Sequence, residues 1–250
     1  MKFRFLDILL FALLFIFINS FPVDLFNISY LYQLIIKIGL RFLLVLYYIY
    51  ILWSNRINIF KFANYRRGLL FLPFIVICFS NLIACGISGS KLGVGSSSTI
   101  IILITIYHLF GVMCEEFLFR LFIQNSLVNS SSLKRIFGSA AIFALFHLLN
   151  MVNVSSVDAL VNVLIQVVYA FGLGLVLAFI YEYTYSIPLC IGFHFIFNFF
   201  NLVFVENIYS VYMTDQAKYL TAIVVGVAAA IYGVILYFFI LNRNEKYFSE

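Results

Sequence analysis

Two adjacent glutamates and an arginine stand inside an apolar stretch that is long enough to cross a membrane. Glu115, Glu116 and Arg120 fall within the run 100–123, which is otherwise mostly apolar. An ionised side chain at the centre of a spanning helix costs about 2.5–3.5 kcal/mol on insertion scales, so three of them need partners inside the protein. Glu116 and Arg120 are four residues apart on one helix face, which predicts an ion pair. Glu115 is rotated by about 100° from Glu116 and is therefore free to face another polar group.

Two histidines and an asparagine further along the chain are the candidate partners of Glu115. His147 lies in the apolar segment 136–151, and His194 and Asn198 lie four residues apart in a later one. A carboxylate beside a histidine, both partly desolvated, can take a proton from water and return it to a leaving amine. His194 and Asn198 share one helix face, as two donors to the oxyanion of a tetrahedral intermediate must. The residue types and spacing predict hydrolysis by an activated water.

The same side chains also suit a metal ion. Glutamate and histidine are ordinary zinc ligands, so Glu115, His147 and His194 could equally hold a divalent ion such as zinc. The sequence leaves the cofactor open between these two mechanisms. A third histidine, His108, precedes Glu115 by seven residues and shares its helix face at a distance of about 10 Å. We expect it to be a core or cavity histidine.

Several other residues of the apolar segments are expected to pack rather than react. Phe143, one turn before His147, is interpreted as a packing residue. Gly172 and Gly174 are expected to allow close helix contact, because no strand precedes them as a phosphate-binding loop would require. The four cysteines have no metal-type spacing and are expected to be small buried side chains: Cys78, Cys85, Cys114 and Cys190.

Two like charges in the second apolar segment need an explanation. Lys37 and Arg41 are four residues apart, so they share one face of a helix over 28–53. They could line a polar interior, lie near acidic lipid headgroups, or belong to a partly interfacial helix. We expect structural accommodation.

Composition places these residues in a polytopic membrane protein. The 250-residue chain is 65% hydrophobic and 10% charged, whereas a soluble domain is about 25% charged. The fold class expected is an all-α membrane helical bundle with about eight transmembrane helices, at 5–20, 28–53, 68–87, 99–126, 136–151, 159–181, 189–205 and 219–241.

The net charge of +5 follows from the placement of cations around a bilayer and does not indicate nucleic-acid binding. The abundance of Phe and Tyr is typical of an AT-rich bacterial genome, so we expect the bacterial cytoplasmic membrane.

The cations indicate the orientation and the termini. With both termini cytoplasmic, the cytoplasmic loops hold most of the lysines and arginines: Lys2, Arg4, Arg56, Lys61, Arg66, Arg67, Lys134, Arg135, Arg243 and Lys246. The opposite side then holds Lys91 and Lys218, as the positive-inside rule requires. We divide the chain into N-terminal helices (1–98), a catalytic core (99–206) and a C-terminal helix with its tail (207–250).

Three short motifs, taken in order, resemble those of a known family. Glu115-Glu116-x-x-x-Arg120, Phe143-x-x-x-His147 and His194-x-x-x-Asn198 are similar in order and rough spacing to the motifs of the CPBP family. This is the CAAX-protease and bacteriocin-processing group, also called Abi, which includes the type II CAAX prenyl endopeptidases. The resemblance covers about 111–201. The turn Thr184-Tyr185-Ser186 is similar to the family's Thr-Gly-Ser, with tyrosine where glycine is usual.

The resemblance implies an intramembrane endopeptidase and assigns a role to each motif residue. Glu115 and His147 would activate water, and His194 and Asn198 would form the oxyanion hole. Glu116 would pair with Arg120 or support the site. The implied partner is a peptide or protein substrate that enters from the lipid bilayer. The choice between a metalloprotease and a glutamate protease, the substrate and the oligomeric state stay open.

Two other classes of function compete with peptide hydrolysis. A non-catalytic bacteriocin self-immunity or regulatory membrane protein could carry the same motifs. A proton- or cation-coupled transporter could use intramembrane Glu, His and Arg, but the chain shows no inverted repeat of the kind that transporters contain. Peptide processing is the function we expect.

Overall fold

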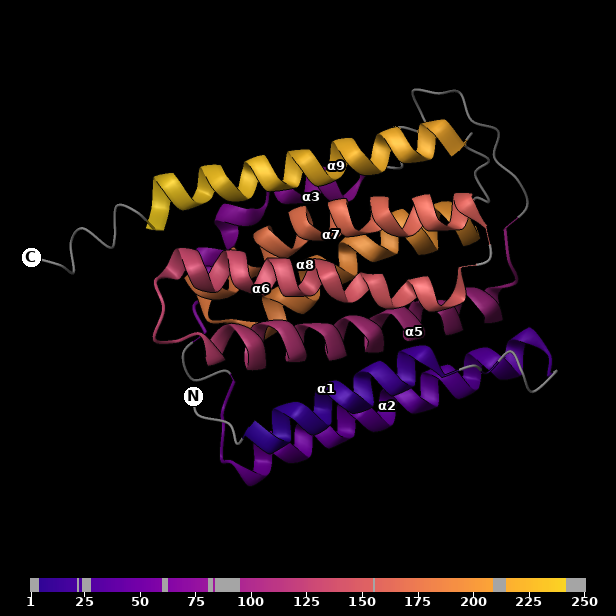
Figure 1. Ribbon diagram of the computed structural model, residues 1–250, viewed down its shortest axis with the longest axis horizontal. Helices are drawn as coiled ribbons and strands as arrows, with labels where there is room; N and C mark the ends of the chain where they lie inside the picture. The colour runs from indigo at the N-terminus through magenta and orange to yellow at the C-terminus, as the bar shows by residue number, and fades with distance from the viewer. Residues whose placement is uncertain are drawn as a thin grey trace, which may run out of the picture.

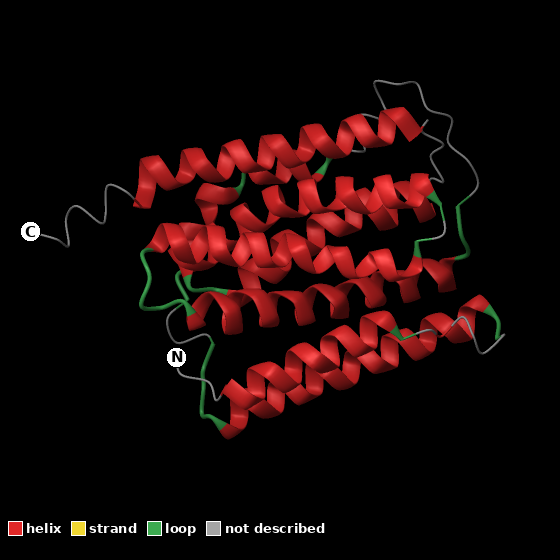
Figure 2. Ribbon diagram, viewed as in Figure 1, coloured by secondary structure: helices red, strands yellow, loops and turns green. Residues whose placement is uncertain are grey.

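The computed structural model describes residues 5–21, 23, 28–59, 63–80, 83, 95–154, 156–208 and 215–241. These residues form helices joined by turns, and no strand occurs among them (Figure 2). The prediction of an all-α fold is confirmed. The elements are α1 (Phe5–Ser20), α2 (Tyr30–Ser54), η2 (Tyr65–Phe71), α3 (Phe74–Cys78), α5 (Ser98–Glu116), η3 (Phe117–Gln124), α6 (Ser132–Phe146), η4 (His147–Asn153), α7 (Val157–Thr184), α8 (Ile187–Asn198), η5 (Phe199–Ile208), α9 (Asp215–Leu236) and η6 (Tyr237–Leu241).

Helix α7 is the centre of the molecule. Helices α6 and α9 pack along it, and α8 contacts α7, α5 and α3 (Figure 1). The paired helices α1 and α2 lie along one edge, where α2 packs on α5. Every residue from 172 to 182 in α7 is buried, as expected for a helix that is apolar all round. Helices α6 and α8, which carry the second and third motifs, therefore pack on α7, and α5, which carries the first motif, packs on α8.

Serine caps set where these helices begin. The hydroxyl oxygens of Ser97, Ser131, Ser156 and Ser186 accept backbone N–H bonds at the starts of α5, α6, α7 and α8. A capping hydroxyl satisfies one of the donors that the first helical turn leaves unpaired. For α6 the cap lies five residues before the predicted start at 136, because the polar first turn is helical although it is not apolar.

Small residues bring α7 close to its two neighbours. A Cβ atom added to Gly172 would lie 2.1 Å from the carbonyl oxygen of Gly226 in α9. One added to Gly174 would lie 3.0 Å from the Phe143 ring and 3.2 Å from Ala140 Cα, both in α6. The prediction that these two glycines allow close helix contact is confirmed.

Within the described residues, five helices are long and apolar enough to cross a membrane, at 30–54, 98–124, 132–152, 157–184 and 219–240. Two shorter apolar helices occupy 6–20 and 187–203. The predicted span 68–87 lies partly outside the described residues, and its described part is divided between η2 and α3 around Pro73, which cannot continue a helical hydrogen-bond ladder. The count of eight spans, the orientation of the termini and the division at 98 and 206 stay predictions.

Candidate active site

The buried ion pair of the first motif lies where α5 changes its winding. Glu116 is the last residue of α5, and the backbone is π-helical from Phe117 to Gln124. Arg120 Nε donates to Glu116 Oε2 at 3.1 Å, and both side chains are fully buried. The predicted ion pair is confirmed. π-Helical turns are rare and occur frequently at functional sites.

A serine of α6 completes the surroundings of Arg120. Arg120 Nη1 donates to Ser139 Oγ at 2.7 Å, and the Ser139 hydroxyl donates to the carbonyl of Phe119 at 2.9 Å. The guanidinium also lies 5.3 Å from the centre of the Phe143 ring. Sequence reasoning missed Ser139. The signal was available, because Ser139 lies eight residues before His147 and so shares its helix face.

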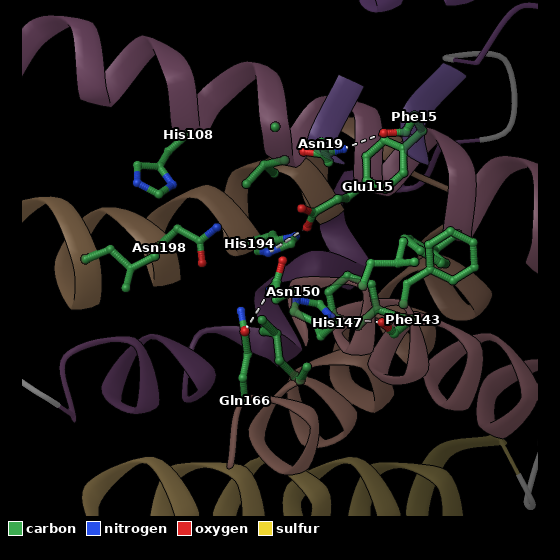
Figure 3. A pocket seen from close by; sticks show the side chains of 18 of the residues that line it. Phe15, Asn19, His108, Glu115, Phe143, His147, Asn150, Gln166, His194 and Asn198 are labelled. Carbon is green, nitrogen blue, oxygen red and sulfur yellow. Dashed lines mark hydrogen bonds and ion pairs between the residues drawn. The ribbon is translucent and has the colours of Figure 1, made fainter. Parts of the chain in front are cut away.

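His194 joins the two glutamates. Its Nδ1 lies 2.8 Å from Glu116 Oε1. Its Nε2 lies 3.6 Å from Glu115 Oε2 (Figure 3). A chain of contacts therefore runs from Arg120 through Glu116 and His194 to Glu115. Glu115 keeps 23% of its side chain exposed, whereas Glu116 has none exposed. Glu115 is thus the carboxylate that other molecules can reach, and Glu116 anchors the ring.

His147 is held by the end of its own helix. It stands where α6 passes into η4, and its Nδ1 lies 2.9 Å from the carbonyl oxygen of Phe143 (Figure 3). A carbonyl can only accept a hydrogen bond, so Nδ1 carries a proton. The other nitrogen, Nε2, is then an acceptor in the neutral ring. This tautomer can take a proton from a bound water.

These side chains line one cavity of about 240 Å³. Glu115, His147, His194 and Asn198 all contribute to its wall, and Figure 3 shows them around a common space. The ionic contact of Glu115 is with His194 rather than with His147. Four phenylalanines exclude water from one side of the cavity: Phe15, Phe119, Phe143 and Phe146.

The cavity has further polar residues that lie outside the three motifs. Asn150 Nδ2 donates to Gln166 Oε1 at 2.8 Å on the side of His147 (Figure 3). Asn19, Arg41 and Tyr107 line the cavity from α1, α2 and α5. No local spacing connects these residues with Glu115, so the sequence could not group them.

His108 and Phe143 line the cavity, and the described cysteines are buried. His108 lines the cavity, with its ring 5.4 Å from that of Tyr107, as a cavity histidine should. Phe143 is buried and packs against Phe119, His147 and His194, which supports its interpretation as a packing residue. Cys78, Cys114 and Cys190 are buried free thiols, as predicted. Cys85 lies outside the described residues.

The turn before the third motif contains a strained residue. Tyr185 follows α7 with φ of 52° and ψ of 28°, in the left-handed region. This conformation is usual for glycine at a helix C-terminus and rare for other residues. The position where the resemblance expects glycine therefore adopts a glycine-like backbone, although a tyrosine occupies it.

The donor set offers no ready-made metal site. Among the described residues, no group of three or more His, Cys, Asp or Glu is arranged to hold a metal ion. The Nδ1 atoms of His194 and His147 are bonded to Glu116 and to the Phe143 carbonyl, which leaves Nε2 of both rings open. Histidines that ligate a metal are commonly oriented by such bonds, so Glu115 and the two Nε2 atoms are the groups that would hold an ion. The assignment of Glu115, His147 and His194 as metal ligands stays a prediction.

Comparison with known proteins gave one finding. The family model described as type II CAAX prenyl endopeptidase Rce1-like matches residues 97–200. The match begins at the cap of α5 and ends two residues after Asn198, so it contains all three motifs. Neither a curated protein nor a solved structure matches the chain.

Proposed function

We propose that this chain is an intramembrane endopeptidase that hydrolyses a peptide bond of a membrane-associated or leader-type peptide. The match of residues 97–200 to the type II CAAX prenyl endopeptidase Rce1-like family model supports this proposal. The family supports protease activity in general and a multi-pass membrane protein. The finer proposal, which residues act and how, comes from the geometry of the cavity.

One observation carries the proposal: a single imidazole lies between an accessible carboxylate and a buried one. His194 contacts Glu115 on the cavity side, and Glu116, neutralised by Arg120, on the protein side. A carboxylate only accepts hydrogen bonds, so Nδ1 donates to Glu116 at 2.8 Å, while Nε2 faces Glu115 at 3.6 Å, which is too long for a hydrogen bond. An ion pair that served only stability would not leave Glu115 open to a cavity. The arrangement suits a reaction that moves a proton and develops negative charge.

The first step would be the attack of water on the scissile carbonyl carbon. Glu115 and the free Nε2 of His147 are the two acceptors available to the attacking water, and Glu115 takes its proton. The new bond joins the water oxygen to the carbonyl carbon, and the carbonyl oxygen becomes negatively charged. Collapse of this intermediate breaks the C–N bond, and the proton held by Glu115 passes to the leaving amine. One water is consumed, and one carboxyl end and one amine are formed.

The negative oxygen would be stabilised from α8. Nδ1 of His194 is fixed on Glu116, and Nε2 faces the cavity beside Glu115, where a proton on Nε2 would point toward the oxyanion. Asn198 lies one helical turn later, lines the same cavity and supplies an amide donor. Donors that are already oriented need no reorganisation as charge develops, and removing one typically costs about 10²–10³ in kcat.

The proposal also covers the route by which the substrate reaches the cavity and the membrane in which the enzyme lies. A peptide would enter laterally from the lipid bilayer, in the bacterial cytoplasmic membrane, and its backbone would pass the cavity wall between α5 and α8. The apolar lining by phenylalanines favours apolar side chains beside the scissile bond.

The test compares wild type with Glu115→Gln in the native host, by quantitative mass spectrometry of membrane and secreted peptides. A peptide that accumulates uncut in the variant is the expected result, and it would also name the substrate. The control is Asp158→Asn, which makes the same carboxylate-to-amide change at an exposed position in the first turn of α7. Identical peptide profiles in wild type and Glu115→Gln would refute proteolysis and favour binding without catalysis.

A second measurement addresses the metal. Purified protein treated with EDTA should cut its substrate at an unchanged rate, because the proposed steps use only Glu115, His147, His194 and Asn198. Loss of activity that is restored by zinc would instead show that these side chains bind a metal during the reaction.

A further inference from the structure

Arg41 reaches the catalytic cavity from α2, outside the segment that the family model matches. Its Nη1 donates to the carbonyl of Tyr107 at 3.0 Å, and its Nη2 donates to Asn19 Oδ1 at 2.8 Å. The guanidinium carbon lies 3.7 Å from the centre of the Tyr107 ring. The guanidinium is thus fixed in one place by α1 and α5, and its position is set before any ligand arrives.

All the partners of Arg41 within the described residues are neutral. A guanidinium has five N–H donors, and the contacts with Tyr107 and Asn19 use two of them. The other intramembrane arginine, Arg120, is fully buried on a carboxylate. Arg41 is half-buried at a cavity wall, and its charge meets no carboxylate in the described part of the chain. A half-buried cation at a cavity wall, with donors beyond those that its neutral partners use, can bind an anion that enters the cavity.

A glycine makes room for this cation beside the catalytic carboxylate. A Cβ atom added to Gly111 would lie 2.4 Å from Arg41 Nη1, so no other residue at this position leaves the guanidinium where it is. Gly111 precedes Glu115 by four residues on α5, which is about 6 Å along the helix axis. An anion bound by Arg41 is therefore held close to the place where the proposed reaction occurs.

We propose that Arg41 binds a carboxylate of the peptide substrate and so determines specificity. This inference rests on the proposed endopeptidase function. The carboxylate is the α-carboxylate at the end of a short leaving peptide, or an Asp or Glu side chain in the same segment. An extended peptide advances about 3.3–3.6 Å per residue, so an anion about one helical turn from Glu115 lies within about three residues of the scissile bond. A guanidinium can bind both oxygens of a carboxylate in one plane, as a lysine cannot.

The neighbouring cation of α2 does not share this position. Lys37 lies one turn before Arg41 and does not line the cavity. The two like charges that the sequence left unexplained therefore have different surroundings, and Lys37 provides a matched control for charge removal on the same helix face.

The experiment uses the full chain in detergent micelles and three quenched-fluorescent peptides. Each has a prenylated cysteine followed by Val-Ile-Met, and they end in a free carboxylate, in a carboxamide, or in a carboxamide with Glu replacing Met. Wild type should cut the free acid about 10- to 100-fold better in kcat/KM than the carboxamide, as the loss of a charge-assisted bidentate pair predicts. If the Glu peptide recovers this loss, an acidic side chain also serves as the ligand; if it does not, the ligand is the terminal carboxylate.

The variants then test whether Arg41 is the cause. In Arg41→Gln the preference for the free acid should fall to within about threefold, while Lys37→Gln should keep the wild-type preference. Arg41→Lys, which keeps the charge but loses the planar fork, should lie between them. Equal cleavage of acid and carboxamide by wild type, or an unchanged preference in folded Arg41→Gln, would overturn the inference. The first comparison needs no variant, so equal cleavage of acid and carboxamide by wild type would refute the inference even if Arg41→Gln does not fold, and Arg41→Lys then tests the role of Arg41.

A binding measurement separates this inference from the proposed function. In a Glu115→Gln background, the free-acid peptide should compete with a labelled peptide at about tenfold lower concentration than the carboxamide, and adding Arg41→Gln should remove the difference. If wild type cuts none of the peptides but this Arg41-dependent difference is present, anion binding by Arg41 stands, and the test of proteolysis is the comparison of wild type with Glu115→Gln in the native host. If the peptides are cut but acid and carboxamide bind and react alike, proteolysis stands and the role of Arg41 fails.

Discussion

Replacing Arg120 with methionine should destabilise the protein strongly, because it leaves a buried carboxylate without its counter-charge. Glu116 and Arg120 are both fully buried, and their contact is 3.1 Å. Methionine fills much of the volume of arginine, so the main loss is electrostatic. Breaking one side of a buried ion pair typically costs about 3–5 kcal/mol. We expect Arg120→Met to lose a free energy of unfolding in this range.

A second variant separates the ion pair from the other contacts of Arg120. Ser139→Ala removes the hydroxyl that accepts from Arg120 Nη1 at 2.7 Å and leaves the pair with Glu116 in place. A hydrogen bond to a charged group contributes about 1.5–3 kcal/mol, so this variant should be destabilised less than Arg120→Met. The double variant Glu116→Gln with Arg120→Met buries no charge and should recover part of the loss of Arg120→Met alone.

The assay is unfolding of the purified protein by SDS in mixed micelles, followed by circular dichroism. Glu115→Gln serves as the matched control, because Glu115 is partly exposed to the cavity and its contact with His194 is longer, at 3.6 Å. Its free energy of unfolding should stay within about 1 kcal/mol of wild type. If Arg120→Met is as stable as Glu115→Gln, the buried chain from Arg120 to His194 does not hold the site together, and the assignment of Glu116 as an anchor is wrong.

Three further predictions concern the backbone and the reaction. Tyr185→Gly should raise the free energy of unfolding by about 0.5–1 kcal/mol, and with it the melting temperature in detergent, because glycine adopts the left-handed backbone without strain. A lower melting temperature would show that the contacts of the tyrosine side chain contribute more than the strain of its φ of 52° costs. Gly172→Ala should lower the free energy of unfolding by about 1–3 kcal/mol, since its Cβ would lie 2.1 Å from the carbonyl oxygen of Gly226. The control Gly192→Ala has open space around its Cβ and should be neutral or stabilising. Similar melting temperatures for the two variants would contradict the close contact of α7 and α9. His147→Gln should lower kcat by about 10²- to 10⁴-fold without changing the melting temperature. The rate is measured with the substrate found in the native host. Full activity of this variant would remove His147 from the proposed mechanism.

The sequence by itself determined the features that depend on local spacing. Glu116 and Arg120 are four residues apart, so any helix over this segment brings them together, and the ion pair followed. The apolar segments predicted helices because only helices satisfy their own backbone in an apolar surrounding. The order of the three motifs predicted a resemblance to CAAX endopeptidases, and the Rce1-like family model matches the segment that contains them, residues 97–200.

The tertiary structure decided which distant groups meet. His194 lies 78 residues from Glu116, and three candidate partners were open for Glu115 until helix packing brought His194 to it. Ser139 and Arg41 reach their partners across 19 and 66 residues, and the room for Arg41 depends on a glycine in another helix. The physical reason is that a helix fixes neighbours three and four residues apart, whereas contacts between helices depend on how side chains of several helices fill the same space. Local periodicity therefore specified each helix and its charged face, and only packing between the helices placed those faces on one cavity.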